Sequence, residues 1–420
     1  MDHFNFHNDQ LFAEEVPVAT IVQQYGTPCY IYSRATLERH WKVFNEAFGA
    51  HPHRICYAVK ANSNIAILNL LAKLGCGFDI VSQGELERVL VAGGNPKNIL
   101  FSGVGKLVPE IKRGLEVGIA CFNVESTAEL LRLNDIAGQQ GKKAPISLRV
   151  NPDIDANTHP YISTGLKENK FGVDIDEAIS LYELARSLPH LEIRGVGYHI
   201  GSQLTELKPF LEAFDRVYDL VKKLRQHGVT VHHLDIGGGL GVRYSNEVPP
   251  SPAEYITEII SRLGNDSLEI IVEPGRAIAA NAGILVTRIE YLKMTPHKNF
   301  AIVDAAMNDL LRPALYNAYQ EIIAVENQDR ETIKVDVVGP VCETGDFLGK
   351  DRMLAVKDQD LLAIRTAGAY GFTMSSNYNS RPRIPEIMVD GDKIYLIRAR
   401  ETIQDLFMHE KLLPEEATCL

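Results

Sequence analysis

The sequence predicts a (β/α)8 barrel joined to a second, mainly antiparallel β-domain. Short β-branched runs recur at a regular spacing through the first two thirds of the chain, and stretches with helical periodicity separate them. After about residue 280, strand-like runs follow one another with few helices between them. A chain of 420 residues is also longer than one ordinary core requires, which favours two domains.

The first four strand-like runs begin at residues 55, 77, 99 and 121, each 22 residues after the last. They are Ile55–Lys60, Gly77–Ser82, Ile99–Gly103 and Cys121–Glu125. The helical stretch after the first run opens with two candidate N-cap residues, Asn62 and Ser63, and closes on glycine. This alternation is typical of consecutive parallel βα units.

Four further runs complete the predicted barrel, and each gap between them holds a helical stretch. They are Ile146–Asn151, Ile193–Ile200, His232–Ile236 and Leu268–Glu273. Eight strand–helix units over about 230 residues exceed the usual strand count of an open doubly wound sheet. The barrel is therefore expected to span 35–280. Residues 1–34 and 281–420 are expected to form the β-domain, because 27–33 is also strand-like.

Composition and charge narrow the possible functions. The net charge of −11 and the pI near 5.7 argue against nucleic acid or an anionic membrane as the main partner. No apolar run reaches the roughly 20 residues that span a bilayer, and the polar, acidic start lacks a signal-peptide pattern. The six cysteines form no CxxC pair, so neither a metal site nor a disulfide framework is expected. These features predict a cytoplasmic protein.

Polar residues and glycines gather where the predicted strands end, which is where barrels of this type carry their active sites. They are Lys60, Asp79, Ser82, Asn123, Arg149, His199, Gly237, Gly238, Gly239 and Glu273. Solvation of a strand end would explain any one of the charged residues alone. The whole set at one end of the barrel favours a catalytic site.

Lys60 ends the first barrel strand, in YAVKAN, where lysine is rarely buried without a partner. Taken alone, it is best explained as a surface lysine whose amine reaches solvent. Beside the other polar strand ends, desolvation is expected to lower its pKa. The neutral amine could then form a Schiff base with pyridoxal 5'-phosphate.

Two loops indicate a phosphorylated ligand. DIGGGLG (235–241) follows the seventh strand and EPGR (273–276) the eighth, and this pair of loops is the usual phosphate site of the barrel. Consecutive glycines let backbone amides approach an anion, although a flexible turn would explain them alone. Glu273 could keep a cofactor ring nitrogen protonated, which makes the ring an electron sink. A salt bridge to Arg276 is the alternative for Glu273.

Ordered motifs across the chain resemble the fold-type III pyridoxal-phosphate decarboxylases. They are YAVKAN (57–62), GFDIVSQGEL (77–86), KFG (170–172), HIGSQ (199–203), DIGGGLG, EPGR, LRPALY (311–316), CETGD (342–346) and AGAYG (368–372). The resemblance covers about residues 25 to 405. It implies pyridoxal 5'-phosphate as the cofactor and a loop at 159–172 that closes over the site.

The resemblance also implies a role for each matched residue. Lys60 binds the cofactor covalently, Glu273 faces its pyridine nitrogen, and His199 packs on its ring, although His199 could also simply fill space. The residues implied around the phosphate are Ser202, Gly237, Gly238, Gly239, Gly275, Arg276 and Tyr370, with Asp79 and Arg149 organising the cofactor. Cys342 reaches the site from the partner subunit and protonates the α-carbon after CO2 leaves. A homodimer with shared active sites is therefore implied.

Charge favours meso-diaminopimelate as the small-molecule substrate and L-lysine as the product. This diamino acid carries an extra carboxylate and an extra ammonium at its far end. Arg276 and Arg312, with Tyr316 and Tyr370, suit the far carboxylate, and Glu343 suits the far ammonium. Family members that act on ornithine have Asp after the cysteine and typically read HVGSG where this chain reads HIGSQ.

Three alternatives stay open at this point. The first is a decarboxylase of the same fold acting on ornithine, arginine or a carboxylated polyamine, which Arg312 and Glu343 disfavour. The second is a racemase, which typically places Arg opposite the pyridine nitrogen and is disfavoured by Glu273. The third is a regulator without turnover, which the joint presence of Lys60, Cys342 and Glu273 disfavours.

Overall fold

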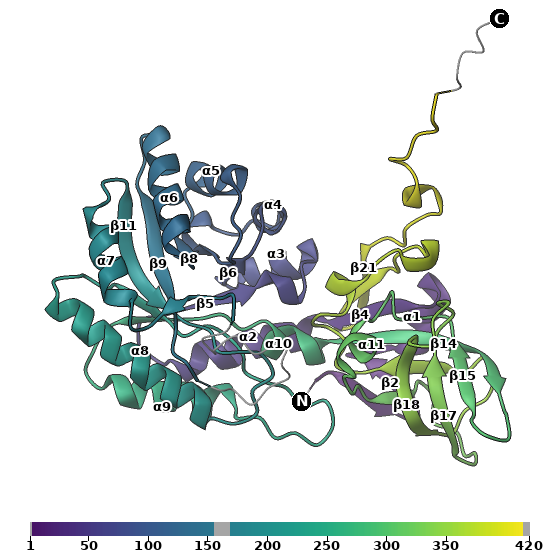
Figure 1. The fold of residues 1–420 in the computed structure, drawn as a ribbon. Coiled ribbons are helices and arrows are strands. Elements are labelled where there is room, and N and C mark those ends of the chain that lie inside the picture. Colours follow the sequence, from purple (N-terminus) through teal and green to yellow (C-terminus); the bar gives the residue numbers. More distant parts are fainter. Residues whose placement is uncertain (1, 155–168, 415–420) are drawn as a thin grey trace, which may run out of the picture.

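The computed structural model describes residues 2–154 and 169–414 and consists of two lobes. A barrel surrounded by helices lies at the left of Figure 1, and a lobe of β-sheets lies at the right. Most of the loop expected to close over the site, 159–168, lies outside the described residues, as does Cys419. No helix in the described ranges is long and apolar enough to cross a lipid bilayer.

Eight parallel strands form a closed barrel. Each strand pairs with its neighbours in chain order, and the last pairs back with the first. The strands are β5 (His53–Ala58), β6 (Gly77–Ile80), β7 (Ile99–Phe101), β8 (Cys121–Val124), β9 (Ala144–Asn151), β11 (Leu191–Gly197), β12 (His233–Asp235) and β13 (Glu269–Val272). All eight strands predicted from the sequence are confirmed. A short strand, β10 (Val173–Asp174), pairs with β9 outside the ring.

A helix follows each barrel strand. The helices are α3 (Ile65–Lys73), α4 (Gln83–Val91), α5 (Val108–Val117), α6 (Thr127–Gln139), α7 (Ala178–Ser187), α8 (Lys208–Gln226), α9 (Pro252–Leu263) and α10 (Arg276–Ala279). In α8, buried Phe210, Phe214, Val217 and Val221 recur at helical spacing and form the stripe that faces the barrel. Strands β6 and β8 are buried at every residue, because helices cover one face and the barrel interior covers the other.

The start of α3 corrects one prediction. The N-cap is Asn64, whose side chain accepts the Ala66 amide at 2.9 Å, and neither Asn62 nor Ser63 caps the helix. The Asn62 side chain instead donates to the carbonyl of Gly368 in the other lobe, at 3.0 Å. A local capping pattern could not distinguish these asparagines, because the partner of Asn62 lies more than 300 positions away in the chain.

The second lobe is mainly antiparallel, as predicted. Its central strand, β14 (Gly283–Lys293), pairs antiparallel with β4 (Cys29–Ser33), β15 (Phe300–Val303) and β19 (Leu361–Ile364). The outer strands are β16 (Ile322–Ala324), β17 (Ile333–Val338), β18 (Phe347–Leu354), β20 (Glu386–Asp390) and β21 (Lys393–Arg398). Only β15–β17 and β4–β20 pair in parallel in the described part of this sheet. The strand expected at 27–33 is thus confirmed as part of this lobe.

The N-terminal residues add a small sheet of β1 (Phe4–His7), β2 (Gln10–Ala13) and β3 (Val16–Pro17), followed by α1 (Val18–Tyr25). Helix α2 (Arg34–Ala47) then leads into the barrel, and α11 (Arg312–Tyr316) interrupts the β-lobe. The domain boundaries placed at 34/35 and 280/281 stay a prediction. They fall where α2 begins and shortly before β14 begins.

A buried ion pair fixes the loop after β7. Lys106 Nζ lies 2.7 Å from Glu129 Oε1 and also donates to the carbonyls of Gly103 and Asn123. The side chains of Lys106 and Glu129 are only 1% and 8% exposed. This contact joins the loop to β8 and α6 below the open end of the barrel.

Replacing Lys106 by Met should lower the free energy of unfolding by about 3–5 kcal/mol, because Glu129 would stay buried without a cation. Chemical denaturation followed by circular dichroism measures this quantity. Lys222→Met is the matched control, since its pair with Asp219 is exposed and should change stability by less than about 1 kcal/mol. Equal losses in the two variants would contradict the prediction.

Candidate active site

A cavity of about 470 Å³ lies at the C-terminal end of the barrel, where residues of the β-lobe complete its lining. The predicted site residues that line it are Lys60, His199, Ser202, Gly239, Glu273, Gly275, Arg276, Arg312, Tyr316 and Tyr370. Asp79, Gly237 and Gly238 do not line the cavity but contact residues that do or lie next to them in the chain. Arg149 does not line the cavity either, and it contacts Glu125 and Phe171, which also lie outside the lining. Cys342 and Glu343 also do not line it. The fold thus brings together most, but not all, of the predicted site.

Lys60 lies in the turn that directly follows β5, and its amine points to a buried carboxylate. Lys60 Nζ donates to Asp79 Oδ2 at 2.8 Å, and Asp79, on the neighbouring strand β6, is fully buried. Burial disfavours the ammonium, but the charges of Asp79 and Glu273 outweigh burial and raise the pKa of Lys60 above its ordinary value. The expectation that desolvation would lower this pKa is therefore wrong, because the sequence did not reveal how close the two carboxylates lie.

Glu273 follows β13 directly and is the least satisfied carboxyl group of the cavity. It is 9% exposed, and its Oε1 has no hydrogen-bond partner among the described residues. Burial, together with the nearby charges of Asp235 and Asp79, raises the pKa of Glu273 well above its ordinary value. Burial likewise raises the pKa of Asp235 to about 6. The suggested salt bridge from Glu273 to Arg276 is absent, because Arg276 donates to Tyr244 and Ser202 instead.

His199 follows β11 and is held as a neutral ring. Its Nδ1 accepts the backbone N–H of Gly238 at 3.2 Å, so the ring proton is assigned to Nε2. Burial, helped by the charges of Arg149 and Lys60, lowers the pKa of His199 well below its ordinary value. A neutral, flat imidazole on the cavity lining suits packing against an aromatic ring.

The glycine run after β12 is closely packed against its neighbours. Gly237 and Gly239 have φ of +67° and +105°, which side chains rarely adopt. A Cβ on Gly238 would lie 2.2 Å from the carbonyl oxygen of Glu273. The amides of Gly237 and Gly238 already donate to Asp235 and His199. Of the three glycines, only Gly239 lines the cavity. The run therefore shapes the loop more than it supplies free amides.

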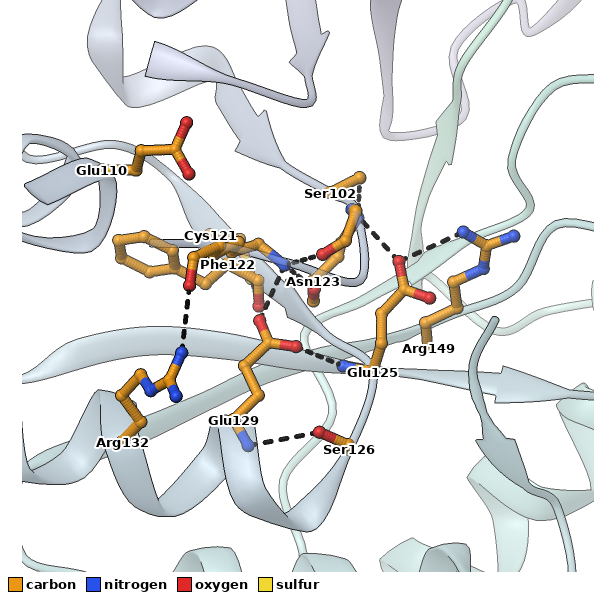
Figure 2. Close-up of polar contacts among 12 residues, drawn as sticks. Ser102, Glu110, Cys121, Phe122, Asn123, Glu125, Ser126, Glu129, Arg132 and Arg149 are labelled. Carbon is orange, nitrogen blue, oxygen red and sulfur yellow. Dashed lines mark hydrogen bonds and ion pairs between the residues drawn. The ribbon is translucent and has the colours of Figure 1, made fainter. Parts of the chain in front are cut away.

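Arg149 is oriented by a carboxylate that the sequence analysis did not single out. Figure 2 shows Glu125, directly after β8, facing Arg149 of β9. Glu125 Oε1 accepts Arg149 Nη1 at 3.3 Å and the Gly103 amide at 3.1 Å, while Oε2 accepts the Gly172 amide at 3.0 Å. One buried carboxylate thus joins the loop after β7 to β9 and to the KFG segment. Arg149 lies over the Phe171 ring at 4.8 Å.

Two buried arginines share one tyrosine at the cavity. Arg276 Nη1 and Arg312 Nη1 donate to the hydroxyl oxygen of Tyr244, at 2.6 and 2.7 Å. Arg276 Nη2 also donates to Ser202 Oγ at 3.0 Å. The arginines are 7% and 6% exposed, and no carboxylate in the described part of the chain forms an ion pair with either. Two buried cations without an anion point to an anionic ligand.

The β-lobe reaches the cavity through the AGAYG segment. The Tyr370 amide donates to the carbonyl of Ala61, next to Lys60, at 2.8 Å. The Tyr370 ring lies 4.9 Å from the guanidinium of Arg276. This contact places Tyr370 beside Arg276 on the cavity lining, and its contact with the phosphate stays a prediction.

Cys342 and Glu343 lie outside the cavity of their own chain. Both are exposed, the Cys342 amide donates to Asn379 Oδ1 at 2.8 Å, and Glu343 accepts the hydroxyl of Tyr378. The contacts of a single chain leave both side chains away from Lys60.

The cavity also contains residues that the sequence analysis missed, chiefly Tyr244, Glu247, Gln203, Tyr319 and Met374. Gln203 belongs to the HIGSQ motif and could have been included. Tyr244 and Glu247 follow the glycine run by only a few positions. Their place in the loop after a barrel strand is the sequence feature that could have identified them as cavity residues.

The residues fit pyridoxal 5'-phosphate. Glu273 Oε1 is a buried acceptor without a donor, which a protonated ring nitrogen would satisfy. The glycine run leaves no room for a Cβ, and Arg276, Ser202 and Gly239 line the adjoining part of the cavity, which suits a phosphate. Lys60 supplies an amine beside these groups.

Comparison with known proteins places the chain in a class. Residues 34–280 match the family model described as pyridoxal-dependent decarboxylase, pyridoxal binding domain. The chain therefore belongs to the pyridoxal-dependent decarboxylases. A lysine/ornithine decarboxylase structure from Vibrio vulnificus, 21% identical with a TM-score of 0.78 over 89% of this chain and 97% of that one, shares the fold.

Closer relatives narrow this class. The diaminopimelate decarboxylases of Vibrio cholerae and Pseudomonas aeruginosa are 61% and 58% identical, covering 99% of this chain and all of theirs. The crystal structure of the Helicobacter pylori diaminopimelate decarboxylase complexed with L-lysine is 46% identical. It has a TM-score of 0.90 and covers 93% of this chain and 98% of that one. The chain belongs to the diaminopimelate decarboxylase family.

Asp79→Asn should lower the pKa of Lys60, because it removes the nearest negative charge that stabilises the ammonium. In the cofactor-free protein, the pH at which Lys60 becomes reactive toward acetic anhydride should therefore fall. Quantitative mass spectrometry of the Lys60 peptide measures this pH, with the exposed Lys222 as an internal reference. An unchanged or higher pH for Lys60 would contradict the electrostatic assignment.

Proposed function

We propose that the protein decarboxylates meso-diaminopimelate to L-lysine and CO2 with pyridoxal 5'-phosphate as cofactor. The observation that carries the proposal is that Lys60 and Glu273 share one cavity with two buried arginines, neither of which forms an ion pair with a carboxylate of the described residues. Relatives named diaminopimelate decarboxylase over nearly the full length support it. Ornithine and arginine lack the second carboxylate that such arginines would bind, and a racemase is disfavoured by Glu273.

The bound cofactor supplies an electron sink for the pair of electrons left when CO2 departs. Glu273 would favour that sink by sharing a proton with the ring nitrogen through Oε1, which has no partner among the described residues. The raised pKa of Glu273 makes its ionised form a strong acceptor for that proton. The neutral His199 can pack on the cofactor ring without adding a second positive charge near the protonated ring nitrogen. The two residues have different effects: Glu273 acts on the charge of the ring, and His199 acts on its position.

Lys60 must lose a proton before its nitrogen can act as a nucleophile, and its pKa is raised in the free site. Asp79 Oδ2, 2.8 Å away, is the nearest group that can accept the proton. The same contact holds Nζ beside Glu273. Asp79 therefore orients Lys60 and would balance the charge of its ammonium whenever the amine is free.

The far end of the substrate is held by the β-lobe and the barrel together. Arg276 and Arg312 bind the far carboxylate, and Tyr316 and Tyr370 line the same part of the cavity. This binding places the other end, which loses CO2, near Lys60. Arg312 also disfavours substrates that would leave its buried cation without an anion.

The proton donor and the ammonium-binding group come from a second subunit. Cys342 and Glu343 are exposed in one chain, and no cysteine is among the described residues that line the cavity. A two-fold homodimer that places these residues over the partner's cavity would give each site a thiol to protonate the α-carbon and a carboxylate for the far ammonium. The cytoplasm suits such an enzyme, because the described cysteines are free and Cys342 must stay reduced.

The purified holoenzyme should form lysine from meso-diaminopimelate and give no product from ornithine or arginine under the same conditions. Amino-acid analysis and CO2 release measure the reaction. Lys60→Ala should abolish turnover and change the visible absorbance of the bound cofactor. Full turnover by this variant, or product from ornithine alone, would refute the proposal.

Mixing two inactive variants tests the shared site. Lys60→Ala and Cys342→Ala homodimers should each lack activity, whereas random exchange of their subunits should restore about a quarter of wild-type activity. Half of the mixed dimers are then hybrids, and one of the two sites in each hybrid carries both native residues. Activity of the mixture at the background level would show that both residues act within one subunit.

A further inference from the structure

Tyr244 has no role among the predicted site residues, yet it holds the two arginines that face the cavity. Its hydroxyl oxygen accepts one N–H from Arg276 and one from Arg312, at 2.6 and 2.7 Å. The guanidinium of Arg312 also lies over the Tyr244 ring, 4.8 Å from its centre. Tyr244 itself is 7% exposed, so these contacts form away from bulk water.

The arrangement is electrostatically incomplete without a ligand. Burial and the neighbouring charge of Arg276 lower the pKa of Arg312, and Tyr244 offsets only part of that cost. A neutral phenol cannot compensate two cations. The hydrogen of the Tyr244 hydroxyl finds no acceptor in the described residues, although its oxygen already accepts both guanidinium donors.

The position of Tyr244 is fixed by its own loop, between β12 and α9. Glu247 Oε2 accepts the amides of Tyr244 and Ser245, at 3.0 and 2.6 Å. Glu247 keeps its negative charge, because these amide contacts overcome burial and hold its pKa below the ordinary value. The loop thus presents the phenol to the arginines before any ligand arrives, which reduces the entropy lost on binding.

We propose that Tyr244 is a specificity-determining residue that holds Arg276 and Arg312 as one carboxylate site and donates its own hydroxyl hydrogen to the far carboxylate of the substrate. The carboxylate then receives donors from two guanidinium groups and one phenol. A ligand without this carboxylate gains nothing from the phenol and leaves the buried Arg312 without an anion. This inference rests on the proposed function, since it identifies a residue that selects the far end of that substrate.

The test compares two ligands that differ in this carboxylate. L-lysine keeps the far carboxylate, because the reaction removes the other one, and cadaverine is the same diamine chain without it. Isothermal titration of wild-type and Tyr244→Phe holoenzyme gives the dissociation constant of each ligand. Phenylalanine keeps the ring, which matters because Tyr244 lines both the active-site cavity and a second cavity of about 900 Å³.

Tyr244→Phe should weaken L-lysine binding about 10-fold to 100-fold, the usual effect of losing a hydrogen bond to a charged group. Cadaverine binding should change less than about twofold, and the KM for meso-diaminopimelate should rise more than kcat falls. Tyr255→Phe is the control, because Tyr255 is buried, its hydroxyl has no hydrogen-bond partner in the described residues, and it lies in α9 outside the cavity. This variant should leave both ligands unaffected.

Equal weakening of the two ligands in Tyr244→Phe would assign the tyrosine a purely structural role and overturn the inference. Unchanged L-lysine binding would overturn it as well. If the wild-type holoenzyme formed no lysine from meso-diaminopimelate, the proposed function would fail. The comparison of L-lysine with cadaverine would still decide the role of Tyr244, because it measures binding without turnover.

Discussion

The site depends on one constraint: buried carboxyl groups lie on one side of the cavity and buried guanidinium groups on the other. Buried carboxyl groups of Asp79, Asp235 and Glu273 lie at the ends of the barrel strands, and two buried guanidinium groups lie where the barrel meets the β-lobe. Lys60 is the only described cation paired with the carboxyl side of the cavity. The two guanidinium groups have no carboxylate partner among the described residues, and Glu273 Oε1 has no hydrogen-bond partner there, so both sides can accept a ligand.

This separation follows from the closed parallel barrel. All eight strands end at the same rim, so a carboxylate near the end of β6 and another after β13 become neighbours of the amine after β5. Burying like charges at one rim destabilises the ionised forms, which raises the pKa of Glu273 and of Asp235. The same arrangement leaves the carboxyl group of Glu273 available to a cofactor, because no neighbouring arginine neutralises it.

The β-lobe completes the site by docking on the turn that carries Lys60. Hydrogen bonds from Tyr370 to Ala61 and from Asn62 to Gly368 join the two lobes within two residues of Lys60. They also bring Arg312, from the β-lobe, to the barrel residues Arg276 and Tyr244. The two buried arginines therefore meet at the junction of the two lobes, whereas Lys60 and Glu273 both belong to the barrel.

The sequence by itself determined the barrel strands, the antiparallel lobe and most of the residues around the cavity. Hydrophobic periodicity records which face is buried, and residues at strand ends must share one rim, so Lys60, His199 and Glu273 could be placed together before any coordinates. Only the tertiary structure decided the sign of the Lys60 pKa shift, the N-cap at Asn64 and the place of Tyr244. Each of these depends on the distance between groups far apart in the chain, and electrostatic and hydrogen-bond energies change steeply over a few ångströms that no sequence pattern encodes.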